Sequence, residues 1–254
     1  TTGTVSEPFS LQQKFPTAFA QLHYARGASL AEAVYLSVRG PYQLLVLGDP
    51  LCQPWARVPE VSVLGLVEGQ PVSGELELKP RVSNDVVPAY FQVFVDGRKT
   101  ADARPGQPVT LDTSTLADGY HELTVVAAAA ATPQPRGRVT VPFQVTNLGA
   151  TVTARLATGR GRKPADAVEY DVELTVTASC DGAASYVLWH NGRTVAEAGA
   201  DGKLALNTSD VGPGPVRLVP EARLGTGKSV LGRPIELTVA APPGAPDEDP
   251  GSEE

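Results

Sequence analysis

The sequence predicts a mainly β fold, in which two consecutive β-sandwiches follow a short piece of an α/β domain. Beyond residue 60, short segments alternate apolar and polar residues between Gly, Pro, Asn and Asp turns, as antiparallel strands do. The two halves of that region also match each other in sequence. The start of the chain differs, because Leu44 to Leu47 form an apolar run without alternation, which is typical of a strand buried on both faces of a parallel sheet.

Length and charge limit the classes of protein that this chain fits. Its 254 residues suffice for one large domain or about two to three small ones. The net charge of -7 argues against nucleic acid or an anionic membrane as a partner, because both require a basic surface. Residues 242–254 contain five acidic residues and no Lys or Arg, so -7 minus -5 leaves -2 for the rest. We expect this acidic Pro-rich tail to be disordered.

Hydropathy and cysteine content limit the compartment only weakly. The sequence contains no run of 18 apolar residues and no charged-then-apolar leader, so it predicts no membrane span and no signal peptide. It holds no Met, which indicates a mature or excised product. Two cysteines cannot staple a disulfide scaffold, and we expect Cys52 and Cys180 to be free thiols in different domains.

Residues 28 to 55 give the clearest signal for a helix followed by a strand. Ser29 to Glu32 has the form S-x-x-E of a capping box, and Gly40-Pro41 would end the helix. The apolar residues at helical spacing are Leu30, Ala33, Val34 and Val38. One αβ unit cannot cover its own parallel strand, so residues 1–57 are predicted to be the end of a larger α/β domain.

A repeat organises the rest of the chain. Asp96 and Asn191 lie 95 residues apart, and Leu111 with Leu206 keeps the same spacing. A repeat of about 95 residues built of short strands fits an immunoglobulin-like sandwich, whose usual size is roughly 100 residues. The sequence therefore predicts immunoglobulin-like sandwiches at 60–147 and 150–241. We expect modest packing between them, because the connection is short.

Particular residues are expected to shape each sandwich. Asp96-Gly97 and Asn191-Gly192 are strong signals for type I′ hairpin turns, because these residue pairs tolerate positive φ. Phe94 and Trp189 precede the turns and are predicted to point inward as core anchors. Tyr120 stands just before a strand, where a tyrosine corner would fix the loop.

One segment resembles part of a phosphate-binding loop. "LGTGKS" at residues 224–229 has the final residues of the motif G-x-x-x-x-G-K-S, but Ala222 stands where the first glycine belongs. The residues that follow alternate like a strand and contain a Pro, whereas a phosphate loop opens a helix. We therefore expect a hairpin loop between the last two strands, and Lys228 is not assigned to a nucleotide.

Candidate catalytic groups each have a simpler structural interpretation. Cys52 follows the apolar strand, where α/β enzymes place nucleophiles, but a buried hydrophobic role at the domain junction is favoured. Asp49 precedes Pro50 and is expected to brace the loop. Of the three histidines, His23 is expected in a helix, whereas His121 and His190 belong to the sandwiches.

Two polar segments are interpreted as loops or turns. "GRGRK" at 159–163 is expected to be a solvated loop, and Asn207-Thr208-Ser209 fits the N-glycosylation pattern but is interpreted as turn chemistry. No paired carboxylates, metal-ligand spacing or Ser/His/Asp set survives the domain assignment. The sequence thus predicts no catalytic, cofactor-binding or metal-binding residue.

The first 57 residues resemble a known family. "GTVSEPF", "KFPTAFAQLHYARGASLAEAVYLSV" and "LLVLGDPLCQPW" together resemble the closing segment of gingipain-like cysteine peptidase domains, which have the caspase-like fold, in a bacterial branch of that family. The resemblance implies that Gly48-Asp49-Pro50 ends the last core strand and that an immunoglobulin-like domain follows. The family's catalytic His-Gly pair and Cys lie upstream of this segment, and this sequence has no His-Gly dipeptide. No catalytic residue is therefore carried over.

Two functional hypotheses follow. In the first, the chain is the non-catalytic C-terminal region of a secreted peptidase-like protein, in which tandem immunoglobulin-like modules act as spacer, anchor or partner-binding unit. In the second, it is part of an active gingipain-like cysteine endopeptidase whose His/Cys dyad lies upstream. The expected partners are the remainder of the caspase-like domain, in upstream polypeptide or another chain, and a protein or glycan ligand. The expected location is secreted, periplasmic or at the cell surface.

Overall fold

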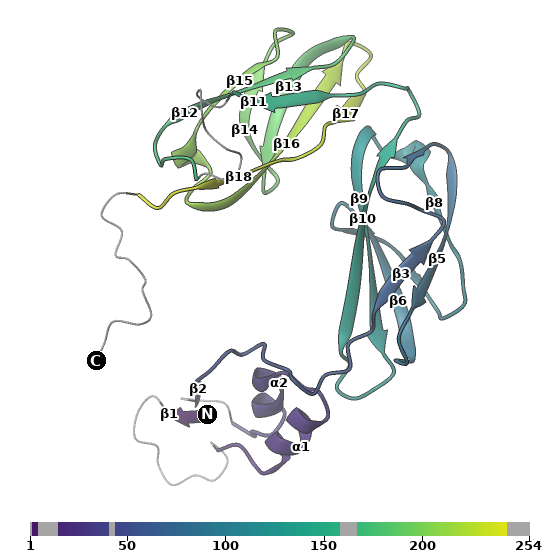
Figure 1. Cartoon of the computed structure of the whole chain (residues 1–254), viewed down its shortest axis with the longest axis vertical. Helices are drawn as coiled ribbons and strands as arrows, with labels where there is room; N and C mark the ends of the chain where they lie inside the picture. Colours follow the sequence, from purple (N-terminus) through teal and green to yellow (C-terminus); the bar gives the residue numbers. More distant parts are fainter. Residues whose placement is uncertain (1, 5–14, 41–43, 158–166, 243–254) are drawn as a thin grey trace. The chain divides into compact units, whose positions relative to one another are not determined.

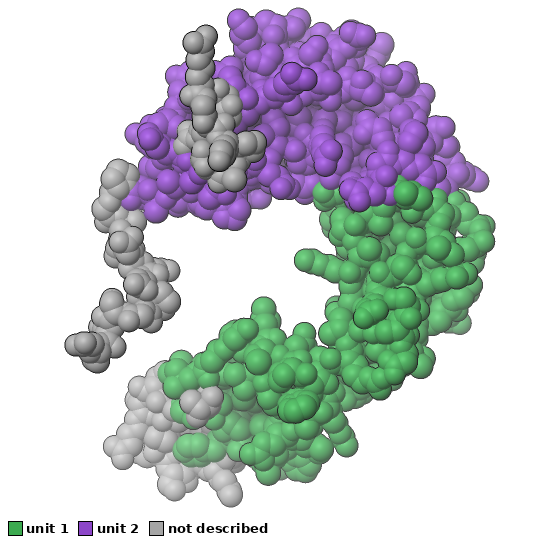
Figure 2. Space-filling view, in the orientation of Figure 1, with its two compact units in different colours: residues 1–67, 77–111, 122–141 green, residues 68–76, 112–121, 142–254 purple. Residues whose placement is uncertain are grey.

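The computed structural model describes residues 2–4, 15–40, 44–157 and 167–242, and the chain is mainly β (Figure 1). By its internal contacts the chain divides into two compact units, coloured green and purple in Figure 2. The first unit consists of Thr1–Val67, Glu77–Leu111 and Glu122–Val141, and the second of Glu68–Leu76, Asp112–His121 and Pro142–Glu254. Three long strands, β5, β9 and β10, contribute residues to both units.

The first elements are short. They are β1 (Thr2–Thr4), α1 (Phe19–Ala25), α2 (Leu30–Tyr35) and β2 (Leu44–Val46). The predicted capping box is present at α2, where the Glu32 N–H donates to Ser29 Oγ at 3.2 Å and the Ser29 N–H donates to Glu32 Oε2 at 2.9 Å. The helix ends at Tyr35, which is earlier than the predicted stop at Gly40.

The described residues neither bury Leu44 to Leu47 nor place them in a parallel sheet, which the prediction assigned to a larger α/β domain. β2 pairs with β1 in the antiparallel direction, with Thr2 opposite Val46. Leu45 is 42% exposed and Leu47 is 52% exposed. An apolar run is buried only when neighbouring strands and covering helices are supplied, and the described residues supply one neighbouring strand.

Eight strands follow in the region predicted to be the first sandwich. They are β3 (Val61–Leu64), β4 (Pro71–Val72), β5 (Glu75–Val82), β6 (Pro88–Val95), β7 (Arg98–Ala103), β8 (Val109–Asp112), β9 (Asp118–Ala129) and β10 (Arg136–Val145). One sheet has the order β3-β5-β8, and the other contains β7, β6, β9, β10 and β4 in that order. In the first sheet β5 pairs with β8, and in the second sheet β6 pairs with β9. The chain therefore passes between the two sheets, as it does in an immunoglobulin-like sandwich.

The second region repeats this plan. Its strands are β11 (Thr153–Leu156), β12 (Glu173–Ser179), β13 (Ala183–His190), β14 (Arg193–Ala198), β15 (Lys203–Asn207), β16 (Gly214–Leu224), β17 (Ser229–Leu231) and β18 (Ile235–Val239). The smaller sheet has the order β11-β12-β15, and β13 pairs with both β14 and β16. β17 and β18 both pair with β16, so they share the place that β10 fills alone in the first region.

The repeat of 95 residues extends to details of the backbone. The predicted hairpin turns are equivalent: Asp96 has φ of 49° and Asn191 has φ of 48°, and each connects the same pair of strands. The irregularities coincide as well, because the register of β6 with β7 shifts between Val93 and Phe94, and that of β13 with β14 between Leu188 and Trp189. Both predicted turns are therefore confirmed, and the two regions share one backbone plan.

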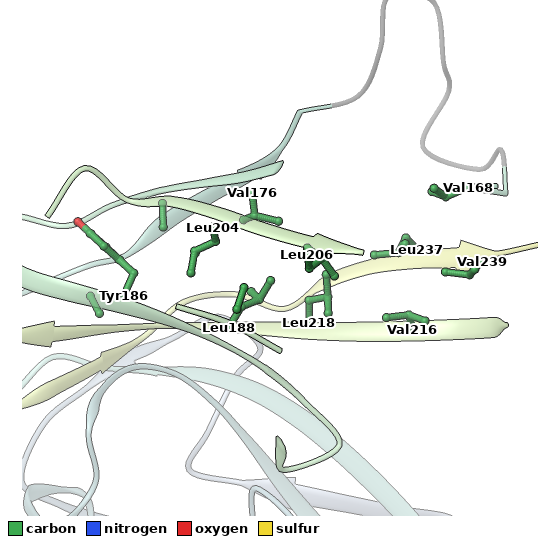
Figure 3. Close-up of a cluster of buried hydrophobic side chains, with 13 residues drawn as sticks. Val168, Val176, Tyr186, Leu188, Leu204, Leu206, Val216, Leu218, Leu237 and Val239 are labelled. Atoms are coloured by element: carbon green, nitrogen blue, oxygen red, sulfur yellow. The ribbon is translucent and has the colours of Figure 1, made fainter. Parts of the chain in front are cut away.

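The core of the second region lies between its two sheets (Figure 3). Val176 and Leu204 from the small sheet meet Leu188 and Leu218 from the large one, and all four are fully buried. Trp189 is only partly buried and lies on the opposite face of β13 from Leu188.

The prediction that Phe94 and Trp189 anchor the cores is therefore wrong. In the first region Val93 and Val95 are the buried residues, and Phe94 between them is partly exposed. Alternation along a strand fixes which residues share a face, but it does not say which of the two faces is buried.

A buried threonine at the same position fastens each repeat. Thr113 Oγ1 donates to the Gly74 carbonyl at 2.8 Å, and Thr208 Oγ1 donates to the Glu169 carbonyl at 2.9 Å. Gly74 and Glu169 are themselves 95 residues apart. Thr208 makes one bond more, because the Val172 N–H donates to its Oγ1 at 3.0 Å. Both threonines are 0% exposed, and each hydroxyl is satisfied by a hydrogen bond to the backbone.

Strands of the two repeats meet within the second unit. β17 pairs in the parallel direction with the start of β9, with Val230 opposite Asp118 and Leu231 opposite Gly119. A Cβ on Gly119 would stand 1.9 Å from the Leu231 carbonyl oxygen, and its φ is +104°. The Asp118 carboxylate accepts the Leu148 N–H at 2.7 Å. Backbone pairing, in addition to the short connection, therefore joins the two repeats.

Candidate functional site

The loop after β2 is braced by its aspartate, as predicted. Asp49 Oδ1 accepts the Leu51 N–H at 2.9 Å, and the Asp49 carbonyl accepts the Cys52 N–H at 3.1 Å. This arrangement is an Asx turn, in which the side chain imitates a backbone turn. The carboxylate has a structural role here.

Cys52 is exposed, so its predicted role as a buried hydrophobic residue is wrong. It lies in the tight turn that Asp49 organises, and that turn projects its side chains to solvent. Its Sγ lies 3.3 Å from Tyr24 Oη. The hydrogen bond to Cys52 raises the pKa of Tyr24 above its ordinary value, so this phenol stays protonated at neutral pH and cannot serve as a base for the thiol.

The two histidines of the repeats hold backbone groups. His121 is 2% exposed, and its Nε2 lies 2.8 Å from the Ala117 carbonyl oxygen. His190 Nδ1 lies 3.1 Å from the Arg217 carbonyl oxygen. His23 lies in the last turn of α1, as expected of a helical residue. These positions give His121 and His190 structural roles.

The segment that resembled a phosphate loop is a hairpin, as predicted. It joins β16 to β17, the Leu224 N–H donates to the Lys228 carbonyl at 2.8 Å, and the Gly227 N–H donates to the Leu224 carbonyl at 2.9 Å. Amides that would have to face a phosphate are therefore already used within the loop. A strand, β17, follows at Ser229, where a phosphate loop would continue as a helix.

The segment Asn207-Thr208-Ser209 forms a turn that its own side chains stabilise. Asn207 Oδ1 accepts the Ser209 N–H at 2.9 Å and also the Ser209 hydroxyl at 2.8 Å, which confirms the turn interpretation of this segment. The segment at 159–163 and the tail from residue 243 lie outside the described residues. Within the described ranges, no group of three or more His, Cys, Asp or Glu side chains is placed to hold a metal ion.

A tyrosine clasp occurs in the second repeat. The Cys180 N–H donates to Tyr186 Oη at 2.8 Å, and this hydroxyl lies 3.3 Å from the Cys180 carbonyl. The predicted corner concerned Tyr120, and the equivalent of Tyr186 in the first repeat is Phe91. Burial, followed by the charge of Asp181, raises the pKa of the Cys180 thiol, which lowers its thiolate fraction at a given pH.

A polar cluster lies on the outer face of the large sheet of the second repeat. The Trp189 indole Nε1–H donates to Glu221 Oε2 at 2.7 Å, and the Ser229 hydroxyl donates to Glu221 Oε1. Arg223 Nε lies 3.8 Å from the same oxygen. We call these four residues the Trp189 cluster. The Glu221 side chain is 12% exposed and that of Arg223 is 47% exposed, so the carboxylate is held within the cluster while the guanidinium reaches solvent.

Sequence reasoning did not find this cluster, although the repeat contains a signal for it. At the offset of 95, Trp189, Glu221 and Arg223 match Phe94, Val126 and Ala128, whereas Ser229 matches the polar Gln134. The backbone pairing is the same, because Gln92 is opposite Val126 just as Val187 is opposite Glu221. Polar residues that replace apolar ones on an unchanged backbone indicate a role other than folding.

Large apolar side chains are exposed in the segment before the repeats. Of the fourteen such side chains among the described residues, nine lie between residues 15 and 55. We call these nine the apolar surface: Phe15, Phe19, Leu22, Tyr35, Leu36, Leu45, Leu47, Leu51 and Trp55. Exposed apolar side chains that gather in one segment mark interaction surfaces, whereas single ones are ordinary. No helix in the described part of the chain is long and apolar enough to cross a membrane.

Comparison with known proteins identifies no family. No protein-family model matches the sequence, and no curated protein matches it. Solved structures match about 70% of the chain. The fibronectin(III)-like modules of Clostridium thermocellum CbhA are 13% identical, with 71% of this chain and 94% of that chain covered and a TM-score of 0.31. A chimeric titin Z1Z2-Z1Z2 tandem is 12% identical, with 71% and 100% covered and a TM-score of 0.33.

A third match is the Bacteroides ovatus protein SGBP-B in complex with a mixed-linkage heptasaccharide. It is 13% identical, with 70% of this chain and 47% of that chain covered and a TM-score of 0.36, so this chain spans about half its length. Such low TM-scores carry no functional argument. None of these matches supports a gingipain-like or caspase-like part. The strand order thus assigns this chain to the tandem immunoglobulin-like sandwiches.

Proposed function

We propose that this chain is the non-catalytic C-terminal region of a secreted peptidase-like protein. In this proposal residues 1–57 complete a caspase-like α/β domain. The sandwiches at 60–147 and 150–241 act as spacer, anchor or partner-binding modules. The acidic tail at 242–254 follows them. Secretion or display at the cell surface belongs to the proposal as well.

The apolar surface is the observation that supports the proposal most. Each large aliphatic side chain that moves from water into a core contributes roughly 1.5 to 3 kcal/mol. Leu45, Leu47 and Leu51 are 42%, 52% and 76% exposed, so most of this contribution is not realised in the chain alone. A segment with this much exposed apolar area is expected to dock on another polypeptide.

The pairing of β2 indicates how docking would proceed. In the described residues β2 pairs with β1 and with no other strand. Its second edge therefore offers backbone amides and carbonyls to an incoming strand, which is the usual way in which an extended segment joins a sheet. A strand of the remaining α/β domain, from upstream polypeptide or from another chain, would satisfy these groups.

The alternative function is that of an active gingipain-like cysteine endopeptidase with its His/Cys dyad upstream. The same apolar surface would then dock on a catalytic domain. Hydrolysis of a peptide substrate by the complete protein, abolished by a thiol-alkylating reagent, distinguishes this alternative from the first proposal. In a variant with Cys52→Ser the hydrolysis should persist, because Cys52 is assigned no catalytic role.

Dye binding and size measurement test the proposed docking surface. The 254-residue chain should bind a hydrophobic fluorescent dye and associate with itself as concentration rises. The double variant Leu45→Ser with Leu47→Ser should reduce both effects. Val87→Ser is the matched control, since Val87 is 69% exposed but lies in the first sandwich region, and it should change neither. A monomeric chain that binds no dye would contradict the proposal.

A further inference from the structure

The Trp189 cluster has the properties of a small preorganised binding face. Trp189 on β13 lies opposite Val219 on β16, and Val187 lies opposite Glu221, so these four side chains share the outer face of the sheet. The bond from Nε1 to Glu221 fixes the orientation of the indole ring. A ring that is already fixed loses little conformational entropy when a ligand stacks on it.

The fold does not require these residues. The first repeat has the same strand pairing and the same register shifts, yet Phe94, Val126 and Ala128 occupy the matching positions. Ala128 and Val126 satisfy the backbone plan with no counterpart of the Glu221 and Arg223 side chains. The cluster is therefore an addition to the sandwich, and the repeat provides an internal comparison for it.

The charges on this face nearly cancel. Glu197 lies opposite Val187 and so joins the same face as Glu221, whereas Arg217 and Arg223 lie on that face of β16. Glu236 on β18 lies opposite Arg217, so three carboxylates and two guanidinium groups give a net charge of -1. Such a face disfavours an anion and favours an uncharged ligand with many hydrogen-bonding groups.

The size of the face limits the class of ligand. It extends over four strands at about 4.8 Å spacing and over four residues at about 3.4 Å each, or roughly 200 Å². Stable protein–protein interfaces bury about 800 Å² on each partner. The face is therefore too small for a standard protein partner, but it is large enough for a short oligosaccharide.

We infer that the Trp189 cluster binds an uncharged oligosaccharide. The sugar ring stacks on the indole, where its C–H groups face the negative π surface. Glu221, only 12% exposed, is occupied within the cluster, where it holds the indole N–H and the Ser229 hydroxyl and so fixes the stacking surface. The exposed Arg223 guanidinium donates to sugar oxygens beside it. This inference rests on the proposed role of the sandwiches as binding modules and names the ligand class.

Tryptophan fluorescence tests the inference directly. The chain has two tryptophans, Trp55 and Trp189, so Trp55→Phe leaves Trp189 as the single reporter. Cellohexaose, xylohexaose, mannohexaose and chitohexaose are titrated separately, with a hexamer of galacturonic acid as the charged comparison. At least one uncharged hexasaccharide should change the emission saturably, and it should bind more tightly than the acidic one. Isothermal calorimetry should give one site per chain.

Variants taken from the first repeat provide the control. The triple change Trp189→Phe, Glu221→Val and Arg223→Ala converts the face to the residues of the first sandwich, so the fold should be retained, as circular dichroism can check. By calorimetry its affinity should fall by about tenfold or more. Phe94→Ala, at the matching position, should leave affinity unchanged.

Three results would overturn the inference: no saturable binding of any uncharged hexasaccharide, undiminished affinity in the folded triple variant, or preference for the acidic hexamer. None of them bears on the apolar surface, so the proposed function fails separately, through absence of dye binding and self-association.

Discussion

Replacement of Thr208 by Val removes one hydroxyl from a fully buried site and preserves its shape. The hydroxyl donates to the Glu169 carbonyl at 2.9 Å and accepts the Val172 N–H at 3.0 Å, and the side chain is 0% exposed. Thr208→Val would remove this partner from the Glu169 carbonyl and the Val172 N–H, both in part-buried hydrogen bonds. Each hydrogen bond contributes about 0.5 to 1.5 kcal/mol, so the free energy of unfolding of the second sandwich should fall by about 1 to 3 kcal/mol.

Urea unfolding followed by Trp189 emission measures this change, in a background of Trp55→Phe. With a denaturant slope of about 2 kcal/mol per molar, the midpoint should fall by about 0.5 to 1.5 M. Thr208→Ser keeps the hydroxyl and loses one methyl group, so it should cost about 1 kcal/mol. Thr113→Val, the matched change in the first repeat, should leave the Trp189 transition in place. If Thr208→Val costs no more than Thr208→Ser, the hydrogen-bond argument fails.

Three other changes have definite expected outcomes. Tyr186→Phe should lower the stability of the second sandwich by about 1 kcal/mol in the same urea assay, since the Cys180 N–H loses its hydrogen bond. The first repeat has Phe91 at the matching position, so a phenylalanine side chain fits this place in the fold. An unchanged midpoint would contradict a stabilising role of the Tyr186 hydroxyl. Gly119→Val should destabilise the second unit by about 2 kcal/mol or more and speed amide exchange in β17. The new Cβ would stand 1.9 Å from the Leu231 carbonyl oxygen, and the positive φ of Gly119 is unfavourable for valine. Gly199→Ala, where nothing lies within 4 Å, is the neutral control, and equal effects of the two would refute this reasoning. Alkylation of Cys180 by iodoacetamide should be slower than that of an unstructured cysteine peptide at the same alkaline pH, because the raised pKa of Cys180 lowers its thiolate fraction; an equal or faster rate would contradict the assigned burial.

Features that depend only on residues close together in the sequence were predicted correctly. Asp96 and Asn191 were expected in equivalent turns because positive φ is cheap for Asn, Asp and Gly, and both turns are present. The capping box at Ser29 needs only residues three positions apart, and it formed as expected. The constant offset of 95 likewise required no knowledge of packing.

Expectations failed where the outcome depends on distant partners. The burial of Leu45 depends on strands and helices that flank it, and the sequence of the strand does not contain that information. The orientation of Trp189 depends on which face of β13 meets the other sheet, and alternation alone leaves both choices open. The Trp189 cluster was missed because Glu221 on β16 reaches Trp189 on the neighbouring strand β13, and that contact follows from the register of the two strands.

Limited proteolysis of the 254-residue chain with mass measurement of the products tests the central claim most directly. That claim is that two sandwiches form the stable body of the chain and that residues 1–57 are an incomplete part of another domain. The account predicts rapid trimming to a core that starts near residue 58 and ends near residue 241, with both sandwiches intact. Protection of residues 1–57 in a monomer, or first cleavage within either sandwich, would contradict it.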